Sequence, residues 1–305
     1  MRFLVAGSSG FLGSNLVAAL NDAGHDVTRV VRRTPTARDE IGWDPYDGLL
    51  DQSVVDKTDV VINLAGSPTV GNPHSAVWAN QLRNSRVTTT RILSEAVART
   101  HRSGMGQPAL LAGSGVGYYG DHGVEEVDET GSSNGGTFMT SVVRDWEAAT
   151  QAAKRAGARV CTIRTAPVID RASAPLRQML PVFKAGLGAR LGGGRQYFPI
   201  ISLRDWVAAT LHLSDSDISG AVNVCCPVTP TNAEFTEALA SAVGRRARFA
   251  IPGRLIAAGA GPVSGELLGS VRARPAALEK DGFGFADYDA RDVVAAALAT
   301  PVGIG

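Results

Sequence analysis

Short apolar runs alternate with longer amphipathic stretches through the first half of the chain. Residues 2–6 form an apolar run, residues 11–21 repeat leucine and alanine at helical spacing, and residues 26–31 form a second run rich in valine. Gly24 stands where the helical pattern ends. This order predicts a strand, a helix and a second strand close together in the sequence, which make a βαβ unit.

The same alternation continues to about residue 165. Apolar runs at residues 60–64, 109–112 and 160–164 are typical of buried strands, and the stretches 77–100 and 140–156 are long enough for crossover helices. The pattern therefore predicts an α/β protein of the Rossmann type, with a doubly wound parallel sheet of at least five strands.

The pattern changes after about residue 170. Prolines and three consecutive glycines at residues 192–194 interrupt the alternation, and helical patterns follow at residues 233–243 and 254–268. This change indicates a second, smaller lobe that is built differently from the first half.

We divide the chain on this basis into two parts. Residues 1–170 are expected to form the Rossmann domain, and residues 171–305 a smaller C-terminal substrate lobe. Residues 220–225 have the pattern of another buried strand, so residues 203–226 are expected to return to the Rossmann sheet.

The composition is that of an ordinary globular protein. Of 305 residues, 44% are hydrophobic and 19% are charged, and 30 Lys and Arg against 29 Asp and Glu leave a formal charge of +1. Such a chain can bury a full core, which argues against disorder as its main state. The near-zero charge provides no global field for nucleic acid and argues against a general nucleic-acid binder.

The sequence carries no signal for a membrane, for export or for a metal. No run of about 18 uncharged apolar residues is present, and the N-terminus lacks the apolar region of a signal peptide. The three cysteines, Cys161, Cys225 and Cys226, are odd in number and lack metal-ligand spacing. We therefore expect a cytoplasmic protein with reduced cysteines, no membrane partner and no metal site.

A glycine-rich segment joins the first predicted strand to the first predicted helix. Glycines at this turn let the backbone approach a pyrophosphate closely, and the free N–H groups and positive end of the following helix face the anion. The spacing is G-x-x-G-x-x-G rather than the commoner G-x-G-x-x-G. The turn predicts a dinucleotide site made by Gly7, Ser9, Gly10, Phe11, Leu12 and Gly13.

Two arginines follow the second predicted strand. An enzyme selective for NAD carries an acidic residue there, which accepts hydrogen bonds from the ribose 2′-hydroxyl. This chain has Arg32 and Arg33, and a guanidinium can bind a 2′-phosphate through two hydrogen bonds. The pair favours NADP(H) as the cofactor; solvated arginines after a strand are the alternative.

Three further segments carry a family resemblance. They are Asn-Leu-Ala-Gly at residues 63–66, Gly-Ser-Gly-Val-Gly-Tyr-Tyr-Gly-Asp at residues 113–121, and Arg-Thr-Ala-Pro-Val at residues 164–168. With these motifs the chain resembles the extended short-chain dehydrogenases/reductases, and more narrowly an atypical NAD-dependent epimerase/dehydratase-like family. The resemblance covers nearly the whole chain.

The resemblance implies roles for individual residues. Leu64, Ala65 and Gly66 would line the adenosine and the nicotinamide ribose, and Pro167 and Val168 would lie against the nicotinamide amide. Two further positions concern the substrate: Ser114 would hydrogen-bond the substrate oxygen, and Arg195 would bind a substrate phosphate. A merely structural loop is the alternative for Arg195.

The chain departs from that superfamily at its acid/base pair. The superfamily moves the proton with a Tyr whose pKa is lowered by a Lys four residues later. Alignment of the helix on Glu147 places Met139 at the Tyr position and Val143 at the Lys position. Tyr118 and Tyr119 are the candidate substitutes, and we expect Tyr119 to face the substrate and Tyr118 to belong to the core.

Two functions remain open at this point. The first is an NADP(H)-dependent oxidoreductase or nucleotide-sugar epimerase/dehydratase-like enzyme, which acts on a small hydroxylated or carbonyl substrate. The second is a cofactor-sensing binding protein that has lost turnover along with the Tyr and Lys. Asp145 and Glu147 are expected on the solvated side of an amphipathic helix, and a homodimer formed through a helix pair stays open.

Overall fold

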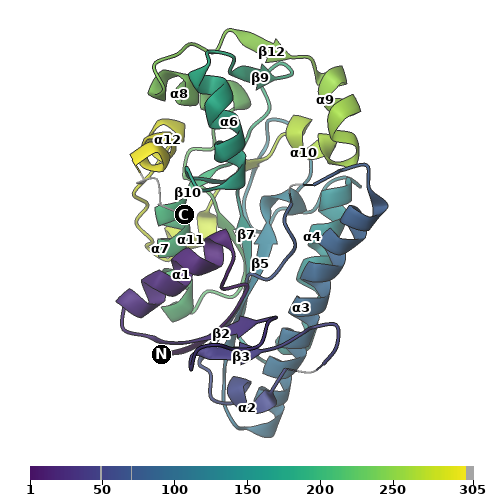
Figure 1. Ribbon diagram of the computed structural model, residues 1–305, viewed down its shortest axis with the longest axis vertical. Coiled ribbons are helices and arrows are strands. Elements are labelled where there is room, and N and C mark those ends of the chain that lie inside the picture. Colours follow the sequence, from purple (N-terminus) through teal and green to yellow (C-terminus); the bar gives the residue numbers. More distant parts are fainter. Residues whose placement is uncertain (49, 70, 300–305) are drawn as a thin grey trace.

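The centre of the molecule is a seven-stranded parallel sheet (Figure 1). The computed structural model describes residues 1–48, 50–69 and 71–299, so the last six residues of the predicted second lobe lie outside the described part. In their order across the sheet the strands are β11 (Gly220–Val224), β7 (Val160–Thr165), β5 (Ala109–Gly115), β4 (Val60–Asn63), β1 (Arg2–Ala6), β2 (Asp26–Val31) and β3 (Glu40–Gly42). The chain starts at β1 and builds outward in both directions, which confirms the predicted doubly wound Rossmann-type fold.

Helices cover both faces of this sheet. One face packs against α1 (Phe11–Asp22) and α7 (Leu203–Asp215), which contact each other. The other face packs against α2 (Gln52–Val55), α3 (Ala76–Ser103), α4 (Phe138–Ala148) and α5 (Gln151–Arg155). Strand residues alternate between the two faces, so that Phe3 and Val5 join the first core and Leu4 joins the second.

The C-terminal part of the chain contributes both to the central sheet and to elements outside it. β11 pairs with β7 in parallel register, and α7 lies beside α1, so residues 203–224 belong to the Rossmann sheet layer. The remaining elements are β6 (Glu126–Val127), β8 (Val168–Ile169), α6 (Ala174–Lys184), β9 (Ala189–Leu191), β10 (Ile201–Ser202), α8 (Asn232–Ala242), β12 (Phe249–Ile251), α9 (Gly253–Ala260), α10 (Ser264–Leu268), β13 (Arg272–Ala273), α11 (Ala276–Lys280) and α12 (Ala290–Ala299). Figure 1 shows α6, α8, α9, β9 and β12 gathered above the sheet.

Two predicted helices are each divided in the structure. The stretch 140–156 forms α4 and α5, because the chain leaves the helical hydrogen-bond pattern at Ala149 and Thr150. The stretch 254–268 forms α9 and α10, because Gly261 adopts a φ of +47°, which a continuous helix does not allow. Periodicity alone does not show such interruptions, since the apolar spacing continues through both.

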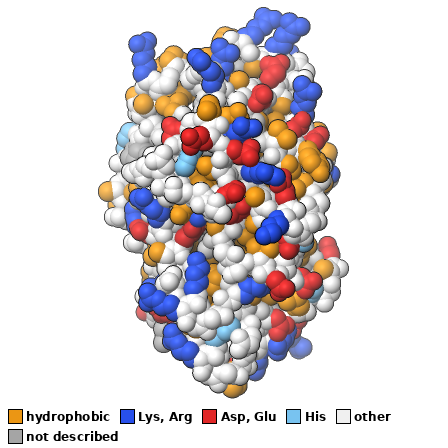
Figure 2. Space-filling view, turned by 180° about the vertical axis from the view of Figure 1, so that it is seen from behind, with side chains coloured by type: hydrophobic (Ala, Val, Ile, Leu, Met, Phe, Trp, Pro, Cys, Tyr) orange, Lys and Arg blue, Asp and Glu red, His pale blue; other side chains and the backbone are white. Residues whose placement is uncertain are grey.

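The surface mixes both signs of charge. Figure 2 shows acidic and basic side chains interspersed over most of one face, in keeping with the formal charge of +1. Among the described helices, none combines the length and apolarity that crossing a bilayer requires. Cys161, Cys225 and Cys226 are buried and form no disulfide within the described residues.

Candidate functional site

The predicted site segments follow neighbouring strands of the sheet. Gly7 follows β1, Leu64 follows β4, Ser114 lies at the end of β5, and Pro167 comes two residues after β7. Because these four strands are parallel neighbours, their carboxyl ends lie along one edge. This edge is where ligands bind in open α/β sheets, so the topology brings the four segments together.

The glycine turn is packed too tightly for side chains. Gly7 has a φ of +83°, and a Cβ there would lie 2.5 Å from the carbonyl carbon of Leu64. A Cβ at Gly13 would lie 2.1 Å from the carbonyl oxygen of Gly7. No side chain caps the N-terminus of α1, and its first turn contains no acidic residue. The turn therefore offers backbone N–H groups at a close backbone approach, which suits a pyrophosphate.

The neighbouring turn at residues 64–66 is fixed by a buried asparagine. Asn63 accepts a hydrogen bond from the backbone N–H of Ala65 at 3.1 Å. Its amide group donates to the hydroxyls of Thr90 at 2.8 Å and Thr89 at 3.2 Å, both on α3. The turn is thereby held to α3 as well as to β4, which gives it a defined position beside the glycine turn.

The two arginines after β2 have different environments. Arg33 pairs with Glu40 through two hydrogen bonds of 2.6 and 2.8 Å, and the Glu40 side chain is 1% exposed. These bonds from Arg33, with one from the backbone of Thr36, lower the pKa of Glu40 to about 2. Arg32 is exposed and has no ion pair or hydrogen bond among the described residues. Arg33 is thus engaged with Glu40, whereas the guanidinium of Arg32 has no such partner among the described residues and is the better placed of the two to bind a phosphate.

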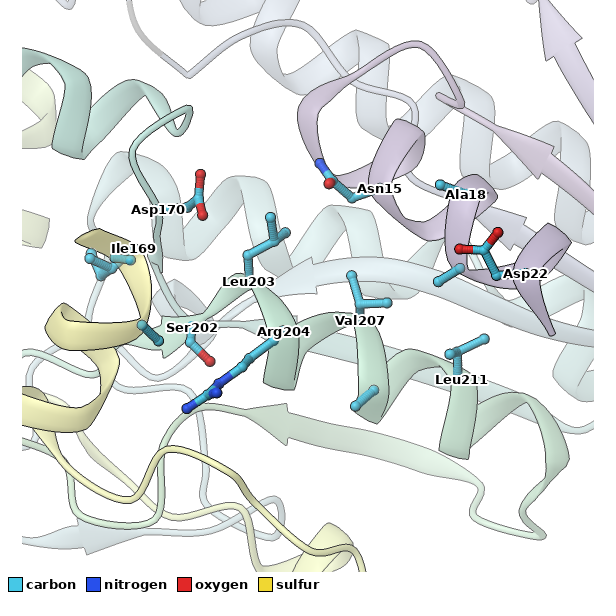
Figure 3. Close-up of a pocket in the computed structure, with 14 residues that line it drawn as sticks. Asn15, Ala18, Asp22, Ile169, Asp170, Ser202, Leu203, Arg204, Val207 and Leu211 are labelled. Atoms are coloured by element: carbon cyan, nitrogen blue, oxygen red, sulfur yellow. The ribbon is translucent and has the colours of Figure 1, made fainter. Parts of the chain in front are cut away.

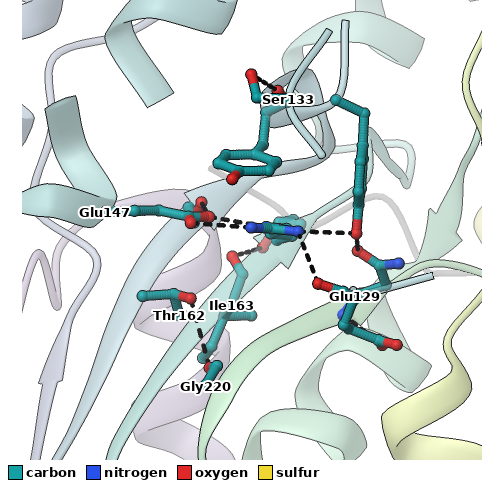
Figure 4. Close-up of polar contacts among 12 residues, drawn as sticks. Glu129, Ser133, Glu147, Thr162, Ile163 and Gly220 are labelled. Atoms are coloured by element: carbon teal, nitrogen blue, oxygen red, sulfur yellow. Dashed lines mark hydrogen bonds and ion pairs between the residues drawn. The ribbon is translucent and has the colours of Figure 1, made fainter. Parts of the chain in front are cut away.

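A buried polar network lies at the end of β5 (Figure 4). Ser114 is 5% exposed and donates a hydrogen bond of 2.6 Å to Glu147 Oε1. Arg164, on the adjacent strand β7, donates to both carboxylate oxygens of Glu147 at 2.8 and 3.0 Å. Burial alone would lower the pKa of Arg164. The hydrogen bonds and the negative charge of Glu147 raise this pKa by more than burial lowers it, so it lies above its usual value. Glu147 therefore accepts hydrogen bonds from both the Ser114 hydroxyl and the Arg164 guanidinium.

The structure reverses the expectation for the two tyrosines. Tyr119 is 0% exposed, and its hydroxyl oxygen lies 2.7 Å from Asn223 Oδ1 and 2.9 Å from Arg164 Nη1. Burial, only partly offset by Arg164, raises its pKa to about 12. Tyr118 is only partly buried, and Arg164 lies 3.5 Å from its ring centroid. Tyr119 is thus the core residue, and Tyr118 is the one with an accessible ring.

Substitution Tyr119→Phe is expected to lower the free energy of unfolding by about 1–3 kcal/mol, because Asn223 Oδ1, the Asp128 carbonyl oxygen and Arg164 Nη1 each lose a hydrogen bond to the buried hydroxyl. The folded state binds the proton of the Tyr119 hydroxyl more tightly than the unfolded state, because burial raises the pKa from its ordinary value of 10 to about 12. The contribution of this proton to the free energy of unfolding is therefore full below pH 10 and is lost as the pH rises through about 12. Urea denaturation at pH 7 measures the first effect, and a wild-type minus Tyr119→Phe absorbance titration at alkaline pH measures the second. A tyrosine that ionises near pH 10 in the folded protein would contradict this environment.

Met139 and Val143 occupy the face on which the superfamily pair is expected. A Cβ at Gly117 would lie 3.9 Å from both Met139 Cβ and Val143 Cγ2. The two side chains therefore face the segment that carries Ser114 and Tyr118. Neither side chain can transfer a proton, and the alignment of these positions with the superfamily pair stays a prediction.

Glu147 and Arg164 are functional candidates that the sequence analysis did not identify. Glu147 is 14% exposed and paired, so its assignment to a solvated helix face is wrong; Asp145, which pairs with Arg83, is exposed as expected. The available signal was Arg164 itself, a charged residue inside an otherwise buried strand. Such a residue requires a counter-charge, and the sequence does not show where it lies.

Arg195 was predicted to bind a substrate phosphate, and the structure does not test this role. Arg195 belongs to the second lobe, in the exposed turn between β9 and β10. The strand pairing that assembles the other segments does not involve it, so its role stays a prediction.

A groove of about 410 Å³ lies elsewhere, between α1 and α7 (Figure 3). Asn15, Ala18 and Asp22 line it from α1, and Val207 and Leu211 from α7. None of the predicted cofactor or catalytic residues lines this groove. The groove is therefore separate from the predicted dinucleotide site.

Comparison with known families agrees with this geometry. A model of the NAD dependent epimerase/dehydratase family matches residues 3–225, which include the sheet and every segment at its carboxyl edge. The chain belongs to this family. The resemblance drawn from the sequence motifs is thereby confirmed.

Several members of the epimerase/dehydratase family are similar over nearly their whole length. An epimerase family protein of Mycobacterium bovis is 43% identical over 283 residues, which are 92% of each chain. The human epimerase family protein SDR39U1 is 32% identical over 262 residues, 85% of this chain and 86% of that one.

Two solved structures have the same architecture. The crystal structure of human SDR39U1 (isoform 2) with NADPH has a TM-score of 0.85 and 28% identity, and covers 98% of this chain and all of that one. A nucleoside-diphosphate sugar epimerase from Corynebacterium glutamicum has a TM-score of 0.79 and 30% identity, covering 98% of this chain and 58% of that one.

Proposed function

We propose that the protein is an NADP(H)-dependent enzyme that oxidises or reduces a small hydroxylated or carbonyl substrate. The observation that carries the proposal is the glycine turn at residues 7–13, together with Arg32, which is unpaired among the described residues and follows β2. A Cβ added at Gly7 or Gly13 of this turn would overlap with backbone atoms. The turn suits the pyrophosphate and Arg32 suits the 2′-phosphate. The similar human protein was crystallised with NADPH, which supports the choice of cofactor.

The remaining cofactor residues follow from the same edge of the sheet. Leu64, Ala65 and Gly66 would line the ribose groups, and Pro167 and Val168 would lie against the nicotinamide. When bound, the dinucleotide would accept or supply a hydride. A cytoplasmic location and a substrate phosphate at Arg195 belong to the same proposal.

The orientation of Ser114 indicates its role. Since its hydroxyl proton is directed to Glu147 at 2.6 Å, the lone pairs of Ser114 Oγ remain to accept a hydrogen bond. Ser114 would thus accept the proton of a substrate hydroxyl and pass its own proton to Glu147. Tyr118, whose ring stacks on Arg164, would cover this contact and keep water away.

A cofactor-sensing binding protein is the second candidate. Met139 and Val143 face the Ser114 segment but cannot transfer a proton, which favours this alternative. In a sensor, bound nucleotide would shift an interface to a partner without being consumed.

Isothermal titration with NADPH, NADP, NADH and NAD tests the cofactor assignment. We expect NADP(H) to bind more tightly than NAD(H). Substitution Arg32→Ala is expected to weaken NADPH by about 10 to 100-fold and NADH by less than about twofold, because only NADPH carries the 2′-phosphate. Equal losses for the two cofactors would refute the role of Arg32.

Arg155→Ala is the matched control, since it removes an exposed cation on α5 and should leave both affinities unchanged. Absorbance at 340 nm with NADPH and a panel of carbonyl and nucleotide-sugar substrates separates the two candidates. Oxidation of NADPH supports the enzyme, and tight binding without turnover of any substrate supports the sensor.

A further inference from the structure

One buried cation has no counter-charge among the described residues. Arg86, on α3, is 8% exposed and forms no ion pair there. Its guanidinium lies 5.2 Å from the ring centroid of Trp146 and donates one hydrogen bond, at 3.0 Å, to the carbonyl of Leu82 in its own helix. Burial lowers the pKa of Arg86 to about 10, which still leaves it charged at neutral pH.

Arg86 lies against the turn predicted to line the ribose groups. A Cβ at Gly66 would be 3.2 Å from Arg86 Cζ and 3.3 Å from Nη1. The preceding residues of that turn, Leu64 and Ala65, contact Gly7. The guanidinium therefore lies against Gly66, the residue directly after the two that pack against the glycine turn.

On its other side Arg86 reaches the Ser114 network through Trp146. A Cβ at Gly113 would lie 2.9 Å from Trp146 Cζ2, and Gly113 precedes Ser114. Arg86 thus stands between the pyrophosphate turn and the hydroxyl that would accept the substrate proton. A dinucleotide with its pyrophosphate at the glycine turn and its nicotinamide near Ser114 would place its nicotinamide-side phosphate and ribose between these two points.

The energetics favour a ligand at this position. A charge buried without a partner destabilises a fold, and proteins tolerate it where it serves a site. A guanidinium has five N–H donors, and the structure uses one of them within the protein. Phosphate or hydroxyl oxygens of a ligand would accept the others.

We propose that Arg86 binds the oxygen atoms of the nicotinamide-side half of the dinucleotide and supplies the cation that Val143 does not. This inference rests on the proposed function. It makes Arg86 and Arg32 the two charged contacts at opposite ends of the cofactor. The alternative is that Arg86 serves only to pack against Trp146.

The test compares a whole cofactor with half of it. Wild type and Arg86→Met are titrated calorimetrically with NADPH and with adenosine 2′,5′-bisphosphate, which lacks the nicotinamide half. We expect Arg86→Met to weaken NADPH at least about tenfold and the bisphosphate less than about twofold, since methionine keeps the apolar volume and removes the donors. Arg32→Ala should weaken both ligands.

Two further variants make the result specific. Arg86→Lys keeps the positive charge but loses the planar arrangement of N–H donors, so its NADPH affinity should fall between those of wild type and Arg86→Met. If Arg86→Met does not fold, Arg86→Lys takes its place in the comparison. Arg83→Met is the matched control one turn earlier on α3; Arg83 pairs with Asp145 and Ser141, and its loss should leave both affinities unchanged.

The outcomes separate the inference from the proposed function. If wild type binds no NADPH, the proposed function fails. If wild type binds NADPH and the Arg86 variants bind it equally well, or lose both ligands to the same extent, the assignment of Arg86 is overturned. A packing role would instead appear as a lower melting temperature of the free protein with an unchanged NADPH dissociation constant.

Discussion

Substitution Arg164→Met is expected to lower the free energy of unfolding by about 3–5 kcal/mol, because it leaves the Glu147 carboxylate buried without its counter-charge. Arg164 is 4% exposed at its side chain and holds both carboxylate oxygens. The loss also removes a donor to the Tyr119 hydroxyl and the cation above the ring of Tyr118. Urea denaturation followed by circular dichroism gives the change as a lower midpoint at an unchanged slope.

Two further variants show whether the effect belongs to the pair. The double variant Arg164→Met with Glu147→Leu removes both charges and should recover at least half of the loss. Arg91→Met breaks the exposed pair between Arg91 and Glu95 on α3 and should change stability by less than about 0.5 kcal/mol. A single Arg164→Met variant as stable as Arg91→Met would mean that water, not the arginine, solvates Glu147.

The central sheet was predictable because its strands are buried on both faces. Such strands form continuous apolar runs separated by crossover segments, and that pattern placed β1, β4, β5, β7 and β11 with boundaries correct to within a few residues. β3 was not predicted, since its three residues, which include the charged Glu40, have no apolar pattern. Short edge strands depend on their neighbour more than on their own composition.

Some features of the candidate site are local in the sequence and could be predicted, whereas others depend on contacts between distant residues. The glycine turn is local, because a strand, three glycines and a helix follow one another in the sequence, and the turn lies at the predicted strand end. The Ser114, Glu147 and Arg164 network joins two strands and a helix across 50 residues of chain. Helical periodicity identified an amphipathic helix but not which of Asp145 and Glu147 would be covered by the sheet.

The same reason explains the tyrosines. Tyr118 and Tyr119 are adjacent, and they point in different directions because the chain enters a short 3₁₀ turn at Val116 directly after β5. Their rings meet edge to face, with centroids 5.6 Å apart; Tyr119 is fully buried and Tyr118 is partly exposed. The sequence does not show which of two adjacent tyrosines is buried, because the backbone path after β5 decides it.

Substitution Gly13→Ala is expected to weaken NADPH binding by at least about 100-fold, which corresponds to about 2.7 kcal/mol. The added Cβ would lie 2.1 Å from the carbonyl oxygen of Gly7 and 2.9 Å from Cα of Ser8. Both contacts are with backbone, so the helix and the turn must separate, and the N–H groups of α1 then no longer converge on the pyrophosphate. Calorimetric titration with NADPH measures the loss.

Two alanine variants give the scale for this result. A Cβ at Gly10 would meet only the Gly7 oxygen, at 3.3 Å, so Gly10→Ala should cause a clearly smaller loss than Gly13→Ala. Gly284→Ala, where a Cβ would meet nothing within 4 Å, should leave NADPH affinity unchanged. If Gly13→Ala binds NADPH as tightly as Gly284→Ala, the turn does not hold a pyrophosphate, and the close approach of Gly7 and Gly13 serves only to pack α1 against the sheet.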